Sequence, residues 1–72
     1  MSKFNEGENV KWEWGNGYGH GKVQSVFTEK VTRKIDGSEV TRDGSEDNPA
    51  YYVEVDDGNN VLKLDSELKS DS

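Results

Sequence analysis

Hydrophobic and polar residues alternate along several short stretches of the chain, and this alternation is typical of β-strands. In residues 8–14, Val10, Trp12 and Trp14 fall on one face of an extended chain, while the residues between them are charged. The pattern predicts a first strand that contributes Trp12 to the core.

A second alternating stretch, residues 20–27, predicts a second strand. Val23 and Phe27 share a face with Gly21, and Val26 lies on the opposite face. Because a glycine inside a strand lets a neighbouring backbone or an aromatic ring approach closely, we expect such a contact on this strand.

The dipeptide at positions 36 and 37 is Asp-Gly, and it lies between two alternating runs, which is a strong signal for a β-hairpin. The predicted hairpin covers residues 30–42 and contains few apolar residues. It is therefore expected to project from the body of the protein, and residues 29–48 are expected to be its most mobile internal segment.

Residues 43–49 have the composition of a loop, and Pro49 excludes a central strand there. Alternation resumes in residues 50–55, which places Tyr51 on one face of a predicted strand and Tyr52 on the other.

The end of the chain predicts one more strand and a short helical turn. Residues 61–64 favour a strand with Val61 or Leu62 directed inward, and residues 65–68 favour a single helical turn. Residues 69–72 are expected to fray.

Several short strands separated by turns predict a single all-β domain, with its core in residues 4–68 of the 72-residue chain. The expected fold is a small SH3-like antiparallel barrel, because closure removes the edges of a small sheet. The hairpin at residues 30–42 and the C-terminal helical turn are additions to that barrel.

Residues 15–23, GNGYGHGKV, have the glycines and the lysine of a phosphate-binding loop but not its spacing. A P-loop requires glycine where Asn16 stands and a hydroxyl where Val23 stands, and it is followed by a helix rather than by a β-branched stretch. The stretch therefore predicts a flexible loop between two strands, with Gly17 and Gly19 in positive-φ backbone.

Composition narrows the possible partners and compartments. The chain has 9 basic and 15 acidic residues, a formal charge of −6, and no cysteine. An acidic chain repels phosphate backbones, so nucleic acid is an unlikely partner. With neither a long apolar stretch nor a signal peptide, the chain is expected to be a cytoplasmic monomer without a membrane association.

The sequence offers little for metal binding or catalysis. Asp43, Ser45, Asp47 and Glu54 match four positions of an EF-hand loop, but its glycine and its flanking helices are missing. His20 is the single histidine and has no neighbouring acid in sequence. We therefore predict no metal, no cofactor and no enzymatic activity.

Several short motifs resemble those of the hypervirulence-associated Tudor-like domain proteins, over residues 4–68. They are Gly7-x-x-Val10-x-Trp12, Gly21-Lys22-Val23, Asp47-Asn48-Pro49-x-Tyr51-x-Val53, Gly58 and Lys63-x-x-Ser66-Glu67-Leu68. The resemblance implies an SH3-like Tudor barrel. Trp14, the glycines that follow it and the Asp-Gly hairpin go beyond those motifs.

Better-known Tudor domains hold a methylated lysine or arginine in a cage of aromatic rings, whose faces attract a cation. The resemblance therefore directs attention to the aromatic residues that the core does not require. The predicted ligand-binding surface consists of Trp14, Tyr18 and Tyr52, with Tyr51 as an alternative to Tyr52.

The core is predicted to contain Trp12, Phe27 and Tyr51, because large rings dominate the cores of small domains, and this is the favoured role of Tyr51. The leading functional hypothesis is a non-enzymatic interaction module that binds a peptide or protein segment around the first loop. The alternative is a nucleic-acid-associated barrel that uses Lys22, Lys30, Arg33 and Lys34.

Overall fold

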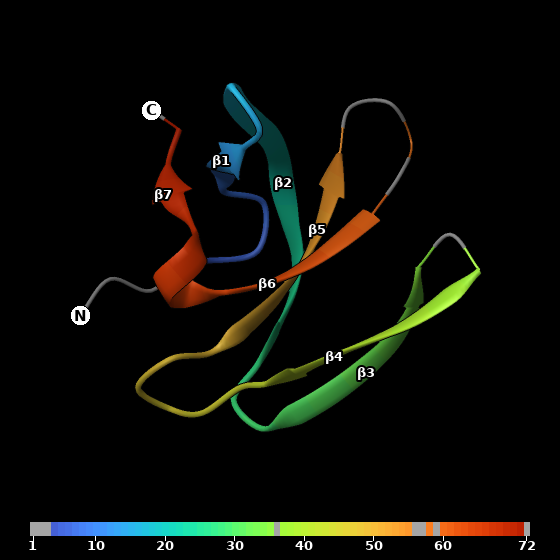
Figure 1. Cartoon of the computed structure of the whole chain (residues 1–72). Helices are drawn as coiled ribbons and strands as arrows, with labels where there is room; N and C mark the ends of the chain where they lie inside the picture. Colours follow the sequence, from blue (N-terminus) through green and yellow to red (C-terminus); the bar gives the residue numbers. More distant parts are fainter. Residues whose placement is uncertain (1–3, 36, 56–57, 59, 72) are drawn as a thin grey trace.

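The computed structural model describes residues 4–35, 37–55, 58 and 60–71, and this part of the chain is built of short strands. The strands are β1 (Asn9–Trp14), β2 (Gly17–Phe27), β3 (Lys30–Ile35), β4 (Ser38–Asp43), β5 (Ala50–Val55), β6 (Asn60–Leu64) and β7 (Lys69–Ser70), with one 3-10 turn, η1 (Asp65–Glu67), before β7 (Figure 1). The all-β class is confirmed.

The strands form one antiparallel sheet of five strands in the order β6-β5-β2-β1-β7, and β3 and β4 form a separate pair. Strand β2 pairs with β1 along its first half and with β5 along its second half, and the register shifts between Val23 and Ser25. Such an irregularity bends a strand. Because η1 carries the chain from β6 at one edge to β7 at the other, the sheet curls into the predicted small antiparallel barrel.

One face of the sheet packs around the aromatic residues that the alternation assigns to the core. Trp12 is 5% exposed and Tyr51 is fully buried. They belong to one cluster, whose other buried members are Phe4, Val10, Val23, Val53 and Leu68. The prediction that Trp12 and Tyr51 lie in the core is confirmed, whereas Phe27, predicted with them, is only partly buried against a second cluster.

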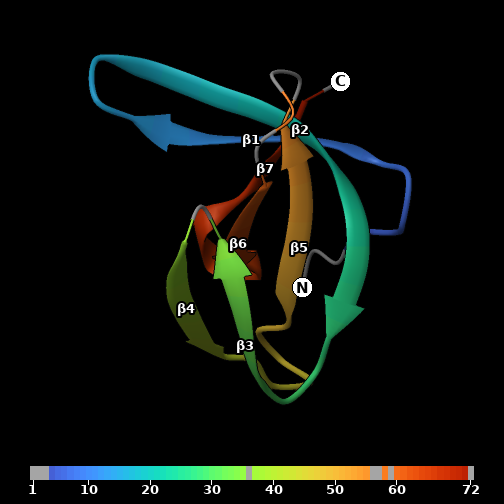
Figure 2. The ribbon, with the colours of Figure 1, turned by 90° about the vertical axis from the view of Figure 1, so that its right-hand side faces the viewer.

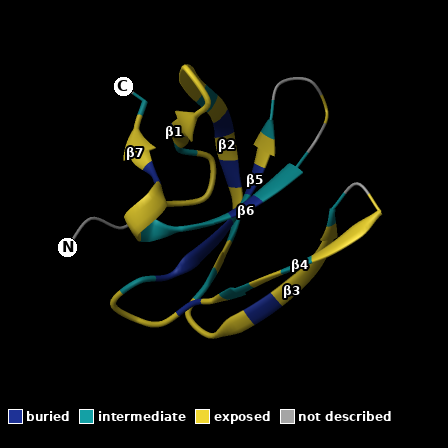
Figure 3. Cartoon of the chain, in the orientation of Figure 1, coloured by how far each residue is buried: buried dark blue, intermediate teal, exposed yellow. Residues whose placement is uncertain are grey.

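The other face of the sheet is also covered, and this corrects the prediction of a projecting hairpin. Val31 of β3 packs with Ala50 and Leu62 in a second buried cluster, against which Phe27 and Tyr52 lie partly buried. Figure 3 shows the buried part of β3 within a hairpin that is otherwise exposed or half-buried. The prediction from the low apolar content of the hairpin is wrong because β5 and β6 carry apolar residues on both faces, and the second face needs the hairpin as a cover.

Two residues separate β3 from β4, as the Asp-Gly signal predicts. Gly37 has a φ of +81°, which a residue with a side chain rarely adopts. Asp36 lies outside the described residues, and the mobility of residues 29–48 stays a prediction.

The glycine-rich stretch is mostly strand rather than loop. Only Gly15 and Asn16 lie between β1 and β2, and Gly17 and Gly19 belong to β2. Of the glycines between residues 15 and 21, Gly15 alone has a positive φ, +56°. The prediction of positive φ at Gly17 and Gly19 is therefore wrong, because alternate glycines here fit a strand face rather than a turn.

The expected close approach is present on β2. An added Cβ at Gly19 would lie 2.5 Å from the Cε2 atom of the Trp12 ring. An added Cβ at Gly21 would lie 2.6 Å from the backbone oxygen of Glu54. The absence of side chains at these two positions lets the Trp12 ring and strand β5 pack on β2.

The predicted helical turn is the 3-10 turn η1, followed by buried Leu68. The Leu64 N–H donates to the Glu67 carboxylate at 2.9 Å, which ties the start of this turn to its end. The expected frayed tail differs from the structure at Lys69 and Ser70, which form β7 beside β1. Residue 72 lies outside the described part.

Candidate functional site

The ribbon formed by β1 and the start of β2 extends beyond the rest of the described chain, as Figure 2 shows. Trp14 is the last residue of β1 and is 73% exposed. It shares a face of β1 with buried Trp12 and Val10. The apolar face of β1 therefore continues beyond the core. Val10 and Trp12 lie over the core, whereas Trp14 lies beyond it and is exposed.

Tyr18 lies on the opposite face of the same ribbon. It pairs with Glu13 across the two strands, whereas Trp14 pairs with Gly17, and directly opposed residues share a face. Tyr18 is 47% exposed. Its ring centre lies 5.1 Å from the Lys11 ammonium and 5.8 Å from the Lys69 ammonium, within the range of a cation–π contact.

The third predicted site residue, Tyr52, lies elsewhere. It pairs with Leu62 of β6 and packs against the second cluster, beneath the β3–β4 hairpin. Trp14, Tyr18 and Tyr52 therefore face three different surroundings, and the structure does not bring them together into one cage. Ligand contact by any of them stays a prediction.

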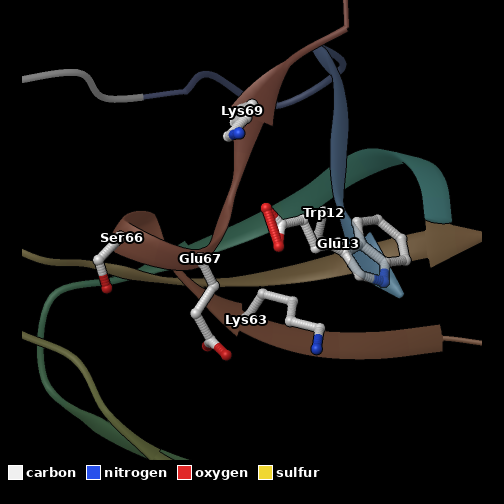
Figure 4. Close-up of a pocket in the computed structure, with 6 residues that line it drawn as sticks. All are labelled: Trp12, Glu13, Lys63, Ser66, Glu67 and Lys69. Atoms are coloured by element: carbon white, nitrogen blue, oxygen red, sulfur yellow. The ribbon is translucent and has the colours of Figure 1, made fainter. Parts of the chain in front are cut away.

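A pocket of about 320 Å³ opens beside β1, between that strand and the segment from β6 to β7. Trp12 and Glu13 line it from β1, and the other lining residues are Lys63, Ser66, Glu67 and Lys69 (Figure 4). Glu67 also lies 3.7 Å from the Nε atom of Arg42, so its charge is already partly compensated. No ion pair of Glu13 or Lys63 occurs within the described residues.

The basic residues of the nucleic-acid hypothesis do not gather into one basic surface. Lys22 lies opposite Glu54, Lys30 opposite Asp43 and Lys34 opposite Glu39 in the strand registers. The Arg33 guanidinium lies 4.7 Å from the centre of the Phe27 ring. Each of the three lysines thus has an acidic residue across from it, which weakens the local field that a phosphate backbone would meet.

The comparisons with known proteins were informative at the level of the family. The family model described as "Hypervirulence associated proteins TUDOR domain" matches residues 7–68, most of the chain. The chain belongs to this family. The search of curated proteins and the search of solved structures gave no significant match.

Within the described part of this Tudor domain, the ionisable group with a clearly perturbed pKa is Tyr51, which lies in the core. The Tyr51 hydroxyl donates to Asp65 at 3.0 Å and accepts from the Phe4 N–H at 3.0 Å. Burial raises the pKa of Tyr51, and the Phe4 hydrogen bond opposes that rise. This residue joins the N-terminal segment to η1 and has the contacts of a structural group.

His20 is the histidine of this Tudor domain, and its Nδ1 atom lies 2.9 Å from the Asp71 carboxylate. The pair is exposed and ties the end of the chain to β2. The described residues contain no group of three potential metal ligands and no helix that is long and apolar enough to cross a membrane.

The pocket residues on the far wall were missed by the sequence reasoning. Lys63, Ser66, Glu67 and Lys69 reach the pocket because η1 turns the chain back beside β1. No local pattern signals that return. The Lys63-x-x-Ser66-Glu67-Leu68 motif is the one signal that marks the segment, and it carries no information on the strand beside it.

Proposed function

We propose that this Tudor domain is a non-enzymatic interaction module that binds a peptide or protein segment at the tip of the β1–β2 ribbon. The observation that carries the proposal is the 73% exposure of Trp14 on a strand whose other apolar residues, Val10 and Trp12, are buried. An exposed tryptophan at a protruding position is the residue type that most often dominates the energy of a protein interface.

Burial explains why Trp14 is better suited to a partner than to the fold. A tryptophan can bury roughly 150–250 Å² of surface, and each apolar Å² removed from water contributes about 25 cal/mol. The fold leaves most of that contribution unused at Trp14, so a partner can gain it. A protein partner fits better than a nucleic acid, because the chain carries a formal charge of −6.

A selection from a displayed library of random peptides tests this function directly. Peptides enriched on the wild-type domain are expected to lose at least about tenfold in affinity for Trp14→Ala, as for a hot-spot residue. Val26→Ala is the matched control, because Val26 is also exposed, at 37%, but lies away from the tip. Both variants are expected to keep the wild-type melting temperature.

Two results of that experiment count against the proposal. Peptides that bind Trp14→Ala as tightly as the wild type would place the interaction elsewhere. Single-stranded RNA or duplex DNA that binds at physiological salt, and loses affinity steeply as salt is raised, would favour the nucleic-acid alternative instead.

The proposal includes a monomeric state and a cytoplasmic location. Light scattering at increasing protein concentration tests the first, and cell fractionation of the tagged chain tests the second. A constant mass of one chain and recovery in the cytoplasmic fraction are the expected results.

A further inference from the structure

Strand β1 extends further than the strand that covers its outer edge. β7 pairs with β1 only at Val10 and Lys11, whereas β2 accompanies β1 as far as Trp14. η1 ends at Glu67, and the chain reaches this edge of β1 only at Lys69, after Leu68. The last three residues of β1 therefore have a partner strand on one side only.

The backbone hydrogen bonds show which residue faces the uncovered edge. The Asn9 carbonyl accepts from the Asp71 N–H on the β7 side at 3.1 Å, and the Glu8 carbonyl accepts from the Val23 N–H on the β2 side at 3.0 Å. Backbone groups alternate between the two edges of a strand, so odd-numbered residues of β1 face β7.

It follows that Glu13 directs its N–H and its carbonyl to the outer edge, two residues beyond Lys11. No hydrogen bond of these two groups to another strand or loop occurs in the described part of the chain. An edge with a free donor and acceptor is the structural requirement for the addition of another strand.

There is space for a strand at this edge. The pocket of about 320 Å³ adjoins it, with Trp12 and Glu13 on the β1 side (Figure 4). Ser66 and Glu67 form part of the opposite wall and supply oxygen atoms that can accept hydrogen bonds. An extended segment in this pocket would have a strand on one side and, on the other, the oxygen atoms of Ser66 and Glu67 beside the ammonium groups of Lys63 and Lys69.

We propose that an extended segment of a partner protein adds to β1 as an antiparallel strand opposite Glu13, and that it carries an apolar residue followed directly by a basic residue. This inference rests on the proposed function and names the chemistry of its ligand. The antiparallel direction continues the direction of β7, which is already antiparallel to β1.

The order of the two residues follows from that direction. An antiparallel segment passes Trp14 before Glu13, and directly opposed residues share a face of the sheet. An apolar residue opposite Trp14 removes its exposed ring from water. A basic residue opposite Glu13 meets an exposed carboxylate that has no ion pair in the described chain, on a protein of formal charge −6.

A second copy of the chain is a poorer occupant of the same edge. Symmetric pairing of two β1 edges at this position would place Glu13 opposite Glu13. Like charges directly opposed across strands are destabilising, and the two chains also repel each other through their net charges of −6.

An array of six-residue peptides with blocked ends tests the inference on the full chain. Every pair of residues is placed at the last two positions, after threonines, which favour extended backbone, because β7 already occupies the edge opposite Lys11. The tightest binding is expected for an apolar residue followed by lysine or arginine, with affinities at least about tenfold weaker when the two are exchanged in order.

Charge reversal at the edge sharpens the test. Glu13→Lys is expected to change the preferred second residue from basic to acidic. Glu39→Lys is the matched control, because Glu39 is exposed on β4, which belongs to the two-stranded sheet and does not pair with β1. Its charge reversal is expected to leave the preferred second residue unchanged. Hydrogen exchange of the Glu13 amide in the wild type, followed by NMR, is expected to slow at least about tenfold when the best peptide saturates the domain.

The outcomes separate this inference from the proposed function. Peptides that need Trp14 but leave the Glu13 exchange rate unchanged, or that show no basic preference, overturn strand addition and leave the interaction surface standing. Strand addition is also overturned if no peptide of the array binds while peptides from the displayed library still bind at Trp14. If the displayed library yields no binding peptide, the proposed interaction function itself is overturned. Protection of Glu13 that grows with protein concentration and without peptide would identify a second copy as the occupant.

Discussion

Replacement of Gly19 by alanine tests the contact between the Trp12 ring and β2 more directly than removal of the ring. The Cβ atom of alanine at this position would lie 2.5 Å from Cε2, 2.6 Å from Nε1 and 2.7 Å from Cζ2 of Trp12. Carbon atoms pack at about 3.5–4.0 Å, so the ring or the strand must move by about 1 Å. Trp12 is 5% exposed and has little free space into which to move.

Gly17→Ala is a matched control for this variant. Gly17 lies two residues earlier on β2, on the same face, and an added Cβ there would meet no atom within 4 Å. Overpacking of a core costs about 1–3 kcal/mol. Alanine in place of an unstrained glycine instead stabilises by about 0.4–1 kcal/mol through the unfolded state.

The free energies of unfolding from urea titrations should therefore separate the two variants by about 1.5–4 kcal/mol, Gly19→Ala being the less stable. In a domain of this size, a change of 1 kcal/mol moves the melting temperature by about 4–8 °C, so circular dichroism resolves the difference. Trp12→Phe, which has a smaller ring, should recover part of the loss when combined with Gly19→Ala. Equal stabilities for the two alanine variants would refute the assigned contact.

Three further outcomes follow from the core and the turns. Trp12→Ala should cost about 3–5 kcal/mol, close to the whole stability of a small domain, and a normal melting transition for this variant would contradict its place in the core. Because the pKa of Tyr51 is raised in the folded state, its stabilising contribution is complete below about pH 10 and is lost as the pH rises through the raised folded value. The free energy of unfolding, measured by urea titration, should therefore fall less steeply above about pH 10 in Tyr51→Phe than in the wild type. Gly37→Ala should destabilise by about 1–2 kcal/mol because Gly37 has a φ of +81°, and thermal melting beside Gly17→Ala measures this cost.

Much of the fold could be predicted because most strands bury one face. Alternation located Trp12 and Tyr51 correctly, and the Asp-Gly signal located the hairpin. Alternation failed where a strand buries both faces. Ala50 and Leu62 form a second cluster, and the hairpin is held on it through Val31. An alternating pattern distinguishes a buried face of a strand from an exposed face, and it does not indicate that another element covers the second face.

The glycine stretch was misread for a related reason. Glycines at alternate positions are typical of turns, but the same spacing places Gly19 and Gly21 on one face of a strand. A strand glycine is distinguished from a turn glycine here by the neighbour that lies over it. That neighbour is the Trp12 ring at Gly19 and the β5 backbone at Gly21. That neighbour is set by strand register, which the local sequence does not contain.

The candidate site depends on lengths of strands rather than on types of residue. Trp14 is exposed because the β1–β2 ribbon is longer than the core beneath it, and Glu13 faces an uncovered edge because β7 begins only at Lys69, opposite Lys11. Natural proteins limit the risk of aggregation at exposed edges by keeping them short and placing charges on them. The edge of β1 has both protections, since among the described residues it offers one free backbone position, and that position is the glutamate Glu13. These protections disfavour pairing between identical acidic chains, and under the proposed strand addition the same charge favours a basic extended segment as the partner.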